Sequence, residues 1–197
     1  MKRILILISI ILVFTSLLAC RESQKTEEIY TYDGESDVSI DDRNFTLEDL
    51  PESMAEEIVV NYYLYNIRPD FDSMADILPD SESDRISLSN KREAYEEGNY
   101  IKSYIIHKVS TLTEEEYNQK SLENGEYNPL YYYGWEEVVE DNNLIEYEII
   151  SVNFTQTHTE RSIDLGPQWG NDTFSRSFIV GRSPKESSYK IYDFGMM

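Results

Sequence analysis

The spacing of apolar residues divides the chain into four stretches. Residues 4–19 form an uncharged apolar run behind Lys2 and Arg3, and residues 21–44 are polar and acidic with almost no periodicity. Apolar residues then recur at helical spacing up to Gly98, and from there to the C-terminus they mostly alternate, as in strands. This order predicts helices followed by antiparallel strands, which is the arrangement of an α+β domain.

The first predicted helix follows a capping signal and ends at a proline. Asp49 and Glu52 form a D-x-x-E capping box, with Thr46 as a competing N-cap. Pro69 disfavours the helical conformation at the residue before it and therefore ends the helix. One face carries apolar residues at helical spacing and is predicted to be buried: Met54, Ala55, Ile58, Val59, Tyr62, Tyr65 and Ile67.

Two further helices are predicted before the strands. A short one ends at Pro79, and a longer one runs from about residue 84 to 97. Gly98 follows the longer helix in the position of a C-terminal cap, where glycine tolerates the left-handed conformation. The short helix is expected to bury one face, formed by Phe71, Met74 and Leu78.

Alternation after Gly98 predicts strands. In the first strand, one face is expected to carry Ile101, Ile105, His107 and Val109, and the other Tyr100, Tyr104 and Ile106. Thr113 and Glu116 predict a brief helical turn, and residues 130–139 are predicted as the next strand.

The run from residue 144 to 160 changes phase halfway along. Ile145, Tyr147 and Ile149 are in one phase, whereas Ile150, Val152 and Phe154 are in the other. Such a slip predicts a β-bulge, which bends a sheet. The last two strands are expected around residues 174–180 and 189–194.

Together these elements predict an α+β fold in which N-terminal helices pack on one face of a curved antiparallel sheet. Their order, over residues 45–197, resembles the NTF2-like, cystatin-related cone of many small exported bacterial lipoproteins. Members of that superfamily often have a strand between the second and third helices, whereas three helices precede the first predicted strand here. The resemblance implies a concave pocket between sheet and helices, and different members use it for ligands, catalysis or dimerisation.

The N-terminus has the form of an export signal: a basic start, an apolar core and a small residue before the cleavage point. Its apolar run is short for a membrane-spanning helix, which needs about 20 residues, and an uncleaved membrane anchor is the alternative interpretation. The segment Leu17-Leu18-Ala19-Cys20 resembles the lipobox of bacterial lipoproteins, with Leu18 as a less usual middle residue.

The lipobox resemblance implies that the Cys20 sulfur receives a diacylglyceryl group and that the signal is cut between Ala19 and Cys20. The reaction needs a nucleophilic thiolate, which explains the cysteine. Two acyl chains give stable membrane anchoring, whereas one chain binds only marginally. Cys20 is the only cysteine, so the mature chain would hold no free thiol and no disulfide. We expect the protein to be lipid-anchored on the extracytoplasmic face of the cell membrane.

Charge and composition limit the domain organisation and the partners. The formal net charge of −21 repels nucleic-acid phosphates, so nucleic-acid binding is not expected. We predict a signal peptide over residues 1–19, an acidic flexible tether over 20–44, and a single α+β domain over 45–197. A short edge strand at residues 30–32 is the alternative within the tether.

The histidines are the first candidates for catalysis. His107 lies in an alternating strand and is interpreted as a core or pocket-lining residue, whereas His158, within TQTHTE, is expected at the surface. The chain contains no Gly-rich phosphate loop, no G-x-S-x-G and no H-E-x-x-H motif. Catalysis by His107 with a carboxylate, as in a hydrolase or isomerase, is the alternative to a binding function.

An acidic cluster is the only candidate for a metal site. Asp80, Glu82 and Asp84 offer oxygen ligands at alternate positions, as calcium prefers. Their spacing lacks the glycine and the terminal glutamate of an EF-hand loop, and helix capping accounts for the same residues. We therefore expect no metal site and no cofactor.

Aromatic residues give the strongest indication of a binding function. The segment Tyr131-Tyr132-Tyr133-Gly134-Trp135 would show aromatic rings on both faces of a strand, of which only one can face the core. The other face would be a binding surface or would be covered by another element. We expect a non-enzymatic module that binds a small ligand or an envelope protein, with these pocket or interface residues: Tyr62, Tyr65, His107, Tyr131, Tyr133, Trp135 and Trp169.

Overall fold

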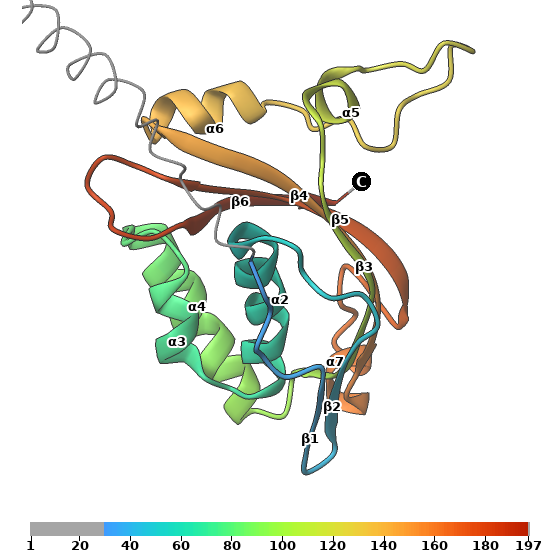
Figure 1. Ribbon diagram of the computed structural model, residues 1–197. Helices are drawn as coiled ribbons and strands as arrows, with labels where there is room; N and C mark the ends of the chain where they lie inside the picture. The colour runs from blue at the N-terminus through green and yellow to red at the C-terminus, as the bar shows by residue number, and fades with distance from the viewer. Residues whose placement is uncertain (1–29, 197) are drawn as a thin grey trace, which may run out of the picture.

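The computed structural model describes residues 30–196 and contains one mixed, six-stranded sheet (Figure 1). The strands follow one another across the sheet in chain order from β1 to β6. Only the β2–β3 pair is parallel, because helices connect these two strands; all other neighbours are antiparallel. The strands are β1 Asp37–Ile40, β2 Arg43–Leu47, β3 Ile101–Thr111, β4 Glu146–His158, β5 Asp172–Arg182 and β6 Lys190–Met196.

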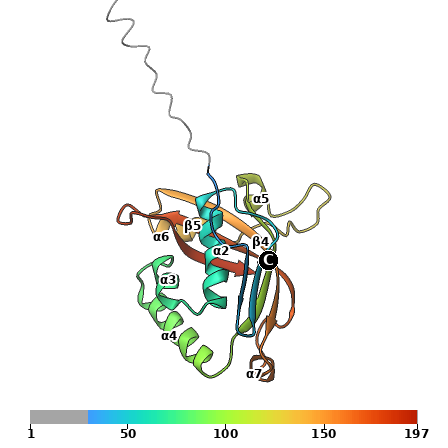
Figure 2. The same cartoon turned by 60° about the horizontal axis from the view of Figure 1, so that its bottom comes forward.

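Helices lie on both faces of this sheet. The sheet bends around α2, which is flanked by α3 and α4, whereas α5 and α6 lie across the opposite face (Figures 1 and 2). The α+β class is confirmed, but the predictions of a purely antiparallel sheet and of helices on one face are wrong. The helices are α2 Met54–Ile67, α3 Phe71–Asp76, α4 Glu82–Glu96, α5 Glu114–Asn118, α6 Trp135–Asp141 and α7 Glu160–Asp164.

Helix α2 is the centre of the main core. Ser53 caps its N-terminus by accepting a hydrogen bond from the Glu56 amide, so the helix begins later than the predicted Asp49 box. The buried Glu56 carboxylate ties the helix to β3 by accepting hydrogen bonds from the Thr111 amide at 2.7 Å and hydroxyl at 2.9 Å. The helix ends at Arg68, before Pro69, as predicted. Met54 is 56% exposed, so its predicted burial is wrong.

The two following helices confirm their predicted ends. Helix α3 stops before Pro79, and α4 runs into Gly98, whose φ of 79° is the left-handed value that glycine accepts. Ser81 caps α4 by accepting a hydrogen bond from the Asp84 amide.

The N-terminal strands correct the predicted tether. Residues 37–44 belong to the β1–β2 hairpin, whereas residues 30–36 form no strand. Phe45 is 1% exposed in the main core, and the hairpin adds β2 alongside β3. The predicted disorder up to Asn44 is therefore wrong for the hairpin, in which Val38 and Arg43 are buried.

A bulge in β3 changes which residues face α2. Ile106 pairs with Phe154 and Lys108 with Asn153, so His107 is an extra residue without a partner in the ladder. After the bulge, Val109 lies on the buried face with Tyr104 and Ile106, not with His107 as predicted.

Strand β4 contains no bulge of its own, and the predicted one is wrong. Its pairing with β5 runs without a shift from Glu146 to Gln156. The phase change instead reflects burial on both faces: Ile150 belongs to the main core, whereas Ile149 belongs to a second cluster under α5 and α6. A strand covered on both sides shows apolar residues in both phases.

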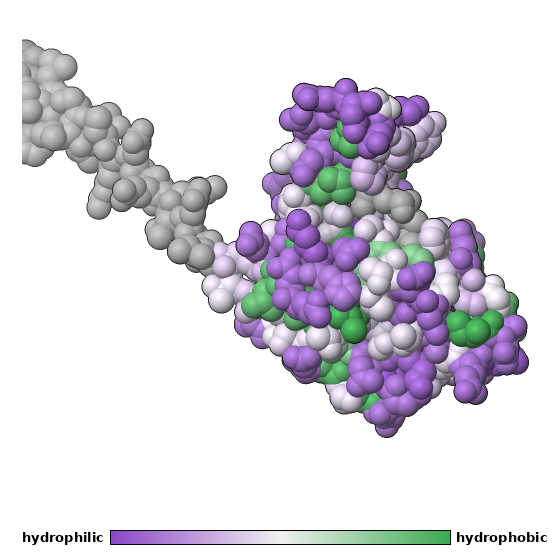
Figure 3. All heavy atoms as spheres, turned by 90° about the vertical axis from the view of Figure 1, so that its right-hand side faces the viewer, coloured by the Kyte–Doolittle hydropathy of each residue, from purple (hydrophilic) through white to green (hydrophobic). Residues whose placement is uncertain are grey.

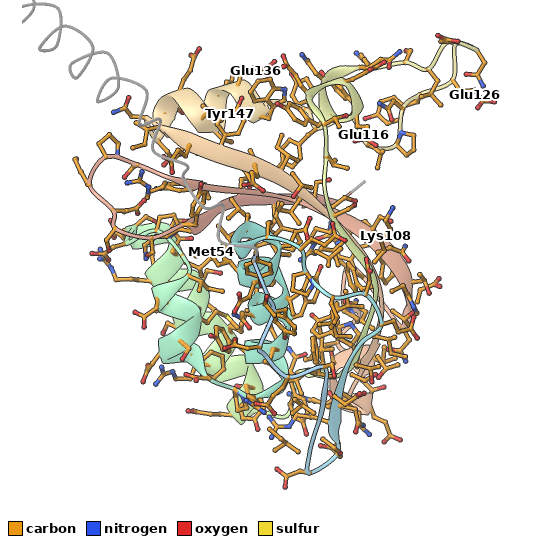
Figure 4. The ribbon with its side chains drawn as sticks, in the orientation of Figure 1. Met54, Lys108, Glu116, Glu126, Glu136 and Tyr147 are labelled. Carbon is orange, nitrogen blue, oxygen red and sulfur yellow. The ribbon has the colours of Figure 1, made fainter. Side chains whose placement is uncertain are left out.

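The predicted strand over residues 130–139 is also wrong, because this segment forms a turn and helix α6. Gly134 adopts φ 76° at the N-cap, and Trp135 and Val138 then pack one helical turn apart on the second cluster. The Trp135 ring lies 5.1 Å from that of Tyr117 and 5.7 Å from that of Tyr147. Figure 4 shows Tyr147 beneath α6, with Glu116 and Glu136 in the same outer layer.

Within residues 30–196, no helix combines the length and the apolar character needed to cross a membrane. The predicted signal peptide, Ala19 and Cys20 lie outside the described residues.

Candidate functional site

A cavity with a mixed aromatic and polar lining lies on the α2 side of the sheet, between α4, the start of β3 and α7. We call it the α4 cavity; its volume is about 420 Å³. Its walls combine aromatic rings with amide, ammonium and imidazole groups. The lining residues are Asn66, Phe71, Ser87, Asn90, Lys91, Ala94, Tyr95, Asn99, Tyr100, Ile101, His158, Ser162 and Pro167.

Lys91 brings the one positive charge on this lining, and its position is fixed. Its Nζ donates to Asn66 Oδ1 at 2.7 Å and lies 5.1 Å from the centre of the Tyr62 ring. Asn66 is itself held by its Nδ2, which donates to the Tyr62 carbonyl at 2.6 Å. Lys91 Nζ also donates to the Tyr62 hydroxyl at 3.5 Å. An ammonium carries three N–H donors, so one donor remains for a polar or anionic group in the cavity.

The aromatic wall is also held from behind. The buried guanidinium of Arg43 lies 5.2 Å from the Tyr95 ring and 5.9 Å from the Tyr100 ring. Tyr95 and Tyr100 are 5.0 Å apart, and Phe71 lies 6.2 Å from Tyr95. Rings packed in such edge-to-face and tilted pairs keep their orientation, so the cavity is largely preformed.

His158 occupies the sheet side of the cavity and is half-buried, not at the surface as predicted. Gln156 Nε2 lies 3.1 Å from the carbonyls of both Trp169 and Gly170, so this atom must be the donating amide nitrogen. It also lies 3.0 Å from His158 Nε2, which therefore accepts. The other ring nitrogen, Nδ1, then donates to Ser162 Oγ at 2.8 Å.

The tautomer of His158 determines whether His158 and Ser162 can act as a catalytic pair. A histidine that activates serine must accept the hydroxyl proton. Here both ring nitrogens are engaged, and the one facing Ser162 is the donor. Burial lowers the pKa of His158 below its usual value near 6.5, and the nearby Trp169 carbonyl opposes this shift more weakly. His158 is thus a neutral wall residue that positions Ser162.

Acidification should therefore destabilise the fold through His158. Protonation places an N–H on Nε2 against the Gln156 donor, and the lowered pKa means that the unfolded chain binds this proton more readily. Stability present above about pH 6.5 is then lost as the pH falls below it. We expect the midpoint of urea unfolding to decrease from pH 7.5 to 5.5 more in the wild type than in His158→Gln. Equal pH dependence of the two proteins would contradict this role.

The predicted site residues lie in several places, and none of them lines the α4 cavity. Tyr62 and Tyr65 pack in or against the main core, and Trp169 packs on Phe174 with ring centres 5.4 Å apart. Trp135 belongs to the second cluster. Tyr131 and Tyr133 line a separate cavity on the opposite face of the sheet.

His107 lies on the face of the sheet opposite α2. Its Nδ1 lies 2.7 Å from Glu48 Oε2, and its Nε2 lies 2.8 Å from Thr155 Oγ1. The order carboxylate, imidazole, hydroxyl is that of a catalytic triad. However, His107 lines neither the α4 cavity nor the cavity beside Tyr131 and Tyr133, and Thr155 also shares a hydrogen bond with Thr173 at 2.7 Å. We therefore interpret these hydrogen bonds of His107 as a link between neighbouring strands.

The acidic segment before α4 is used for capping and surface ion pairing. Asp84 bonds the Ser81 hydroxyl, and Asp80 pairs with Arg85. Among the residues that the structure describes, no group of three or more His, Cys, Asp or Glu side chains is placed to hold a metal ion.

Comparison with known proteins returns no relative: no family model, no curated protein and no solved structure matches this chain.

The lining of the α4 cavity could be anticipated only in part from the sequence. Tyr95, Tyr100 and Phe71 lie near helix and strand ends, where the pattern is ambiguous. The one local signal was the pair Gln156 and His158, two polar residues in phase with buried Phe154 on the same strand. Polar residues on a buried face need partners and often border a cavity.

Proposed function

We propose that this protein is a lipid-anchored, extracytoplasmic lipoprotein that binds a small amphipathic molecule in the α4 cavity. The observation that carries the proposal is the composition of that cavity. Aromatic rings form its apolar wall, while Lys91 and the amides of Asn66, Asn90 and Asn99 offer hydrogen bonds. Ligand sites typically combine a mainly apolar lining with a few such convergent polar groups.

The ligand that suits this lining has a flat or apolar body and a polar or anionic group. The body would pack on Tyr95, Tyr100 and Phe71, and the polar group would accept from the Lys91 ammonium. The tautomer of His158 gives no support to hydrolysis at this cavity. We therefore favour a binding module over a hydrolase or isomerase.

We also propose an NTF2-like cone as the fold and the cell membrane as the location. A bent sheet with α2, α3 and α4 against one face supports an NTF2-like cone. The lipobox at Leu17 to Cys20 supports cleavage after Ala19 and attachment to the cell membrane through the lipid on Cys20. The acidic charge supports a body that stands away from anionic lipid headgroups.

Native mass spectrometry of the full-length protein, extracted gently from its own membranes, tests ligand binding. We expect additional mass that disappears on denaturation and whose value identifies the ligand. Ala94→Trp fills the cavity and should abolish this mass, because Ala94 lines it. Glu93→Trp is the matched control, since Glu93 is an exposed neighbour on the same helix and does not line the cavity.

Each outcome of the mass measurements either supports or overturns ligand binding in the α4 cavity. Additional mass on the wild type and on Glu93→Trp, but not on Ala94→Trp, supports the proposal. A wild-type protein without additional mass, or an Ala94→Trp variant that keeps it, would overturn binding in the α4 cavity. Far-ultraviolet circular dichroism of all three proteins verifies that they are folded.

A further inference from the structure

The segment between α5 and α6 projects from the body over residues 121–127, which are all exposed, and returns to the sheet at Asn128 (Figure 1). The buried Asn128 side chain closes it, donating to the Glu116 carbonyl at 2.8 Å and to the Gln119 carbonyl at 2.7 Å, and accepting from the Leu130 amide at 3.0 Å. The Tyr132 amide donates to the Tyr117 carbonyl at 2.9 Å. The tyrosines that follow Asn128 are therefore held against β5 and β6.

These tyrosines enclose a second cavity of about 280 Å³, which we call the tyrosine cavity. Tyr127 and Tyr131 form two walls at nearly a right angle: their ring centres are 6.3 Å apart, and the planes meet at 84°. Tyr133 also lines the cavity and is 84% exposed. The floor comes from the sheet, and the full lining is Tyr127, Tyr131, Tyr132, Tyr133, Ser177, Asp193 and Gly195.

A carboxylate lies in this aromatic lining. Asp193 Oδ2 accepts a hydrogen bond from the Tyr132 hydroxyl at 2.7 Å, which orients the carboxylate. Within residues 30–196, no lysine, arginine or histidine forms an ion pair with Asp193. Burial raises the pKa of Tyr132, and the adjacent Asp193 raises it further, so the phenol stays a hydrogen-bond donor.

The surroundings of the tyrosine cavity are strongly acidic. From Glu114 to Asp141 the chain carries nine acidic residues and a single basic one, Lys120. Figure 3 shows a lobe projecting above the body that is mainly hydrophilic, and Figure 4 shows Glu116, Glu126 and Glu136 in this outer layer. Such a field attracts cations and repels anions over roughly one Debye length, about 8 Å at physiological salt.

We propose that the tyrosine cavity binds an organic cation, an ammonium or guanidinium head group. Ring faces attract a cation through their negative quadrupole, and alkylated ammonium groups are bound by aromatic walls of this kind. Asp193 supplies the compensating charge at the floor. A volume of 280 Å³ lies below the roughly 300–1,000 Å³ of sites for whole drug-sized ligands, so the cavity suits a head group.

This site is independent of the α4 cavity. It lies on the other face of the sheet, shares no lining residue with the α4 cavity, and prefers the opposite charge. The head group has two sources: a free quaternary ammonium compound, or a lysine or arginine side chain of another protein. Both offer the same chemistry, and the probes below distinguish them.

Isothermal titration calorimetry of the full-length protein in nonionic detergent tests the proposal. The probes are choline, N-acetyl-arginine amide and N-acetyl-lysine amide, with 3,3-dimethylbutan-1-ol as the neutral isostere of choline. We expect at least one cation to bind and the isostere not to bind. Asp193→Asn should weaken that cation about tenfold or more, because the amide keeps an acceptor for Tyr132 but removes the charge.

Two further variants separate a specific site from general attraction to an acidic surface. Tyr133→Leu removes an exposed ring without disturbing the core and should weaken binding about two- to fivefold. Asp37→Asn removes an equal charge from exposed β1 and should leave binding unchanged.

The outcomes are decisive in either direction. Binding of choline alone assigns the site to a free ammonium compound, whereas binding of the amino-acid amides alone assigns it to protein side chains. No binding of any cation at millimolar concentration would overturn the proposal. So would equal binding of the neutral isostere, or equal affinity of Asp193→Asn and the wild type. None of these results bears on the α4 cavity.

Discussion

Replacement of Phe178 by alanine is expected to lower the free energy of unfolding by about 3–5 kcal/mol, the usual cost of deleting a buried phenylalanine side chain. Phe178 is completely buried on β5, at the point where α2 crosses the sheet. Its ring lies 5.8 Å from that of Tyr62 and 5.9 Å from those of Tyr63 and Phe194. The neighbours are large rings that cannot close the resulting void.

Equilibrium unfolding in urea, followed by circular dichroism, measures this loss. Since domains of this kind have a free energy of unfolding of about 5–15 kcal/mol, the urea concentration at the unfolding midpoint should fall strongly. Tyr133→Ala is the control, because it removes an aromatic ring that is 84% exposed and should change stability by no more than about 0.5 kcal/mol. A cost below 1 kcal/mol for Phe178→Ala would mean that α2 does not pack on β5 as described.

Replacement of Cys20 by alanine is expected to release the protein from the membrane. Under the proposed lipidation and cleavage after Ala19, the lipid on the Cys20 sulfur attaches the mature chain to the membrane, and cysteine occurs nowhere else in the chain. No helix within residues 30–196 offers a second way to span the bilayer. Without acyl chains, the acidic body has no favourable interaction with anionic headgroups.

Membrane fractionation, combined with metabolic labelling by a fatty-acid analogue, measures this change. The wild type should sediment with membranes and carry label, whereas Cys20→Ala should carry none. Ser23→Ala, in the same polar segment, is the matched control and should behave like the wild type. Because an unprocessed apolar signal can itself hold a chain in the membrane, N-terminal sequencing accompanies the assay. Label on Cys20→Ala would refute lipidation at this residue.

Local signals in the sequence predicted helix ends well, because each depends on one residue's backbone chemistry. Pro69 ends α2, Gly98 follows α4 with a positive φ, and Thr113 with Glu116 forms a capping box at α5. These features need no knowledge of the rest of the fold.

Burial on both faces of the sheet could not be predicted in the same way. The phase change at Ile149 and Ile150 has the pattern of a bulge, and only the position of α6 shows that each residue enters a different cluster. The run of tyrosines before Trp135 suggested a strand for the same reason. In both cases the pattern does not show that residues 135–141 form helix α6, which covers the second face of the sheet.

The candidate sites were predicted only where aromatic residues cluster in the sequence. Tyr131 and Tyr133 line the tyrosine cavity, but their charged partner Asp193 comes from the last strand. The α4 cavity has no such cluster, because its walls come from α2, α3, α4, β3 and α7 together. His158 was predicted at the surface because its neighbours in the sequence are polar, although every second residue of β4 faces inward.

The order of the strands also determines how the domain responds to mechanical force. A chain held at its N-terminal end transmits tension first to Tyr30 and its hydrogen bond to Glu57, and then to the β1–β2 hairpin at the sheet margin. Antiparallel pairs pulled from one end open one after another and yield at low load. Strand β1 therefore gives way first, while β2 with Arg43, α2 and strands β3 to β6 keep both cavities intact.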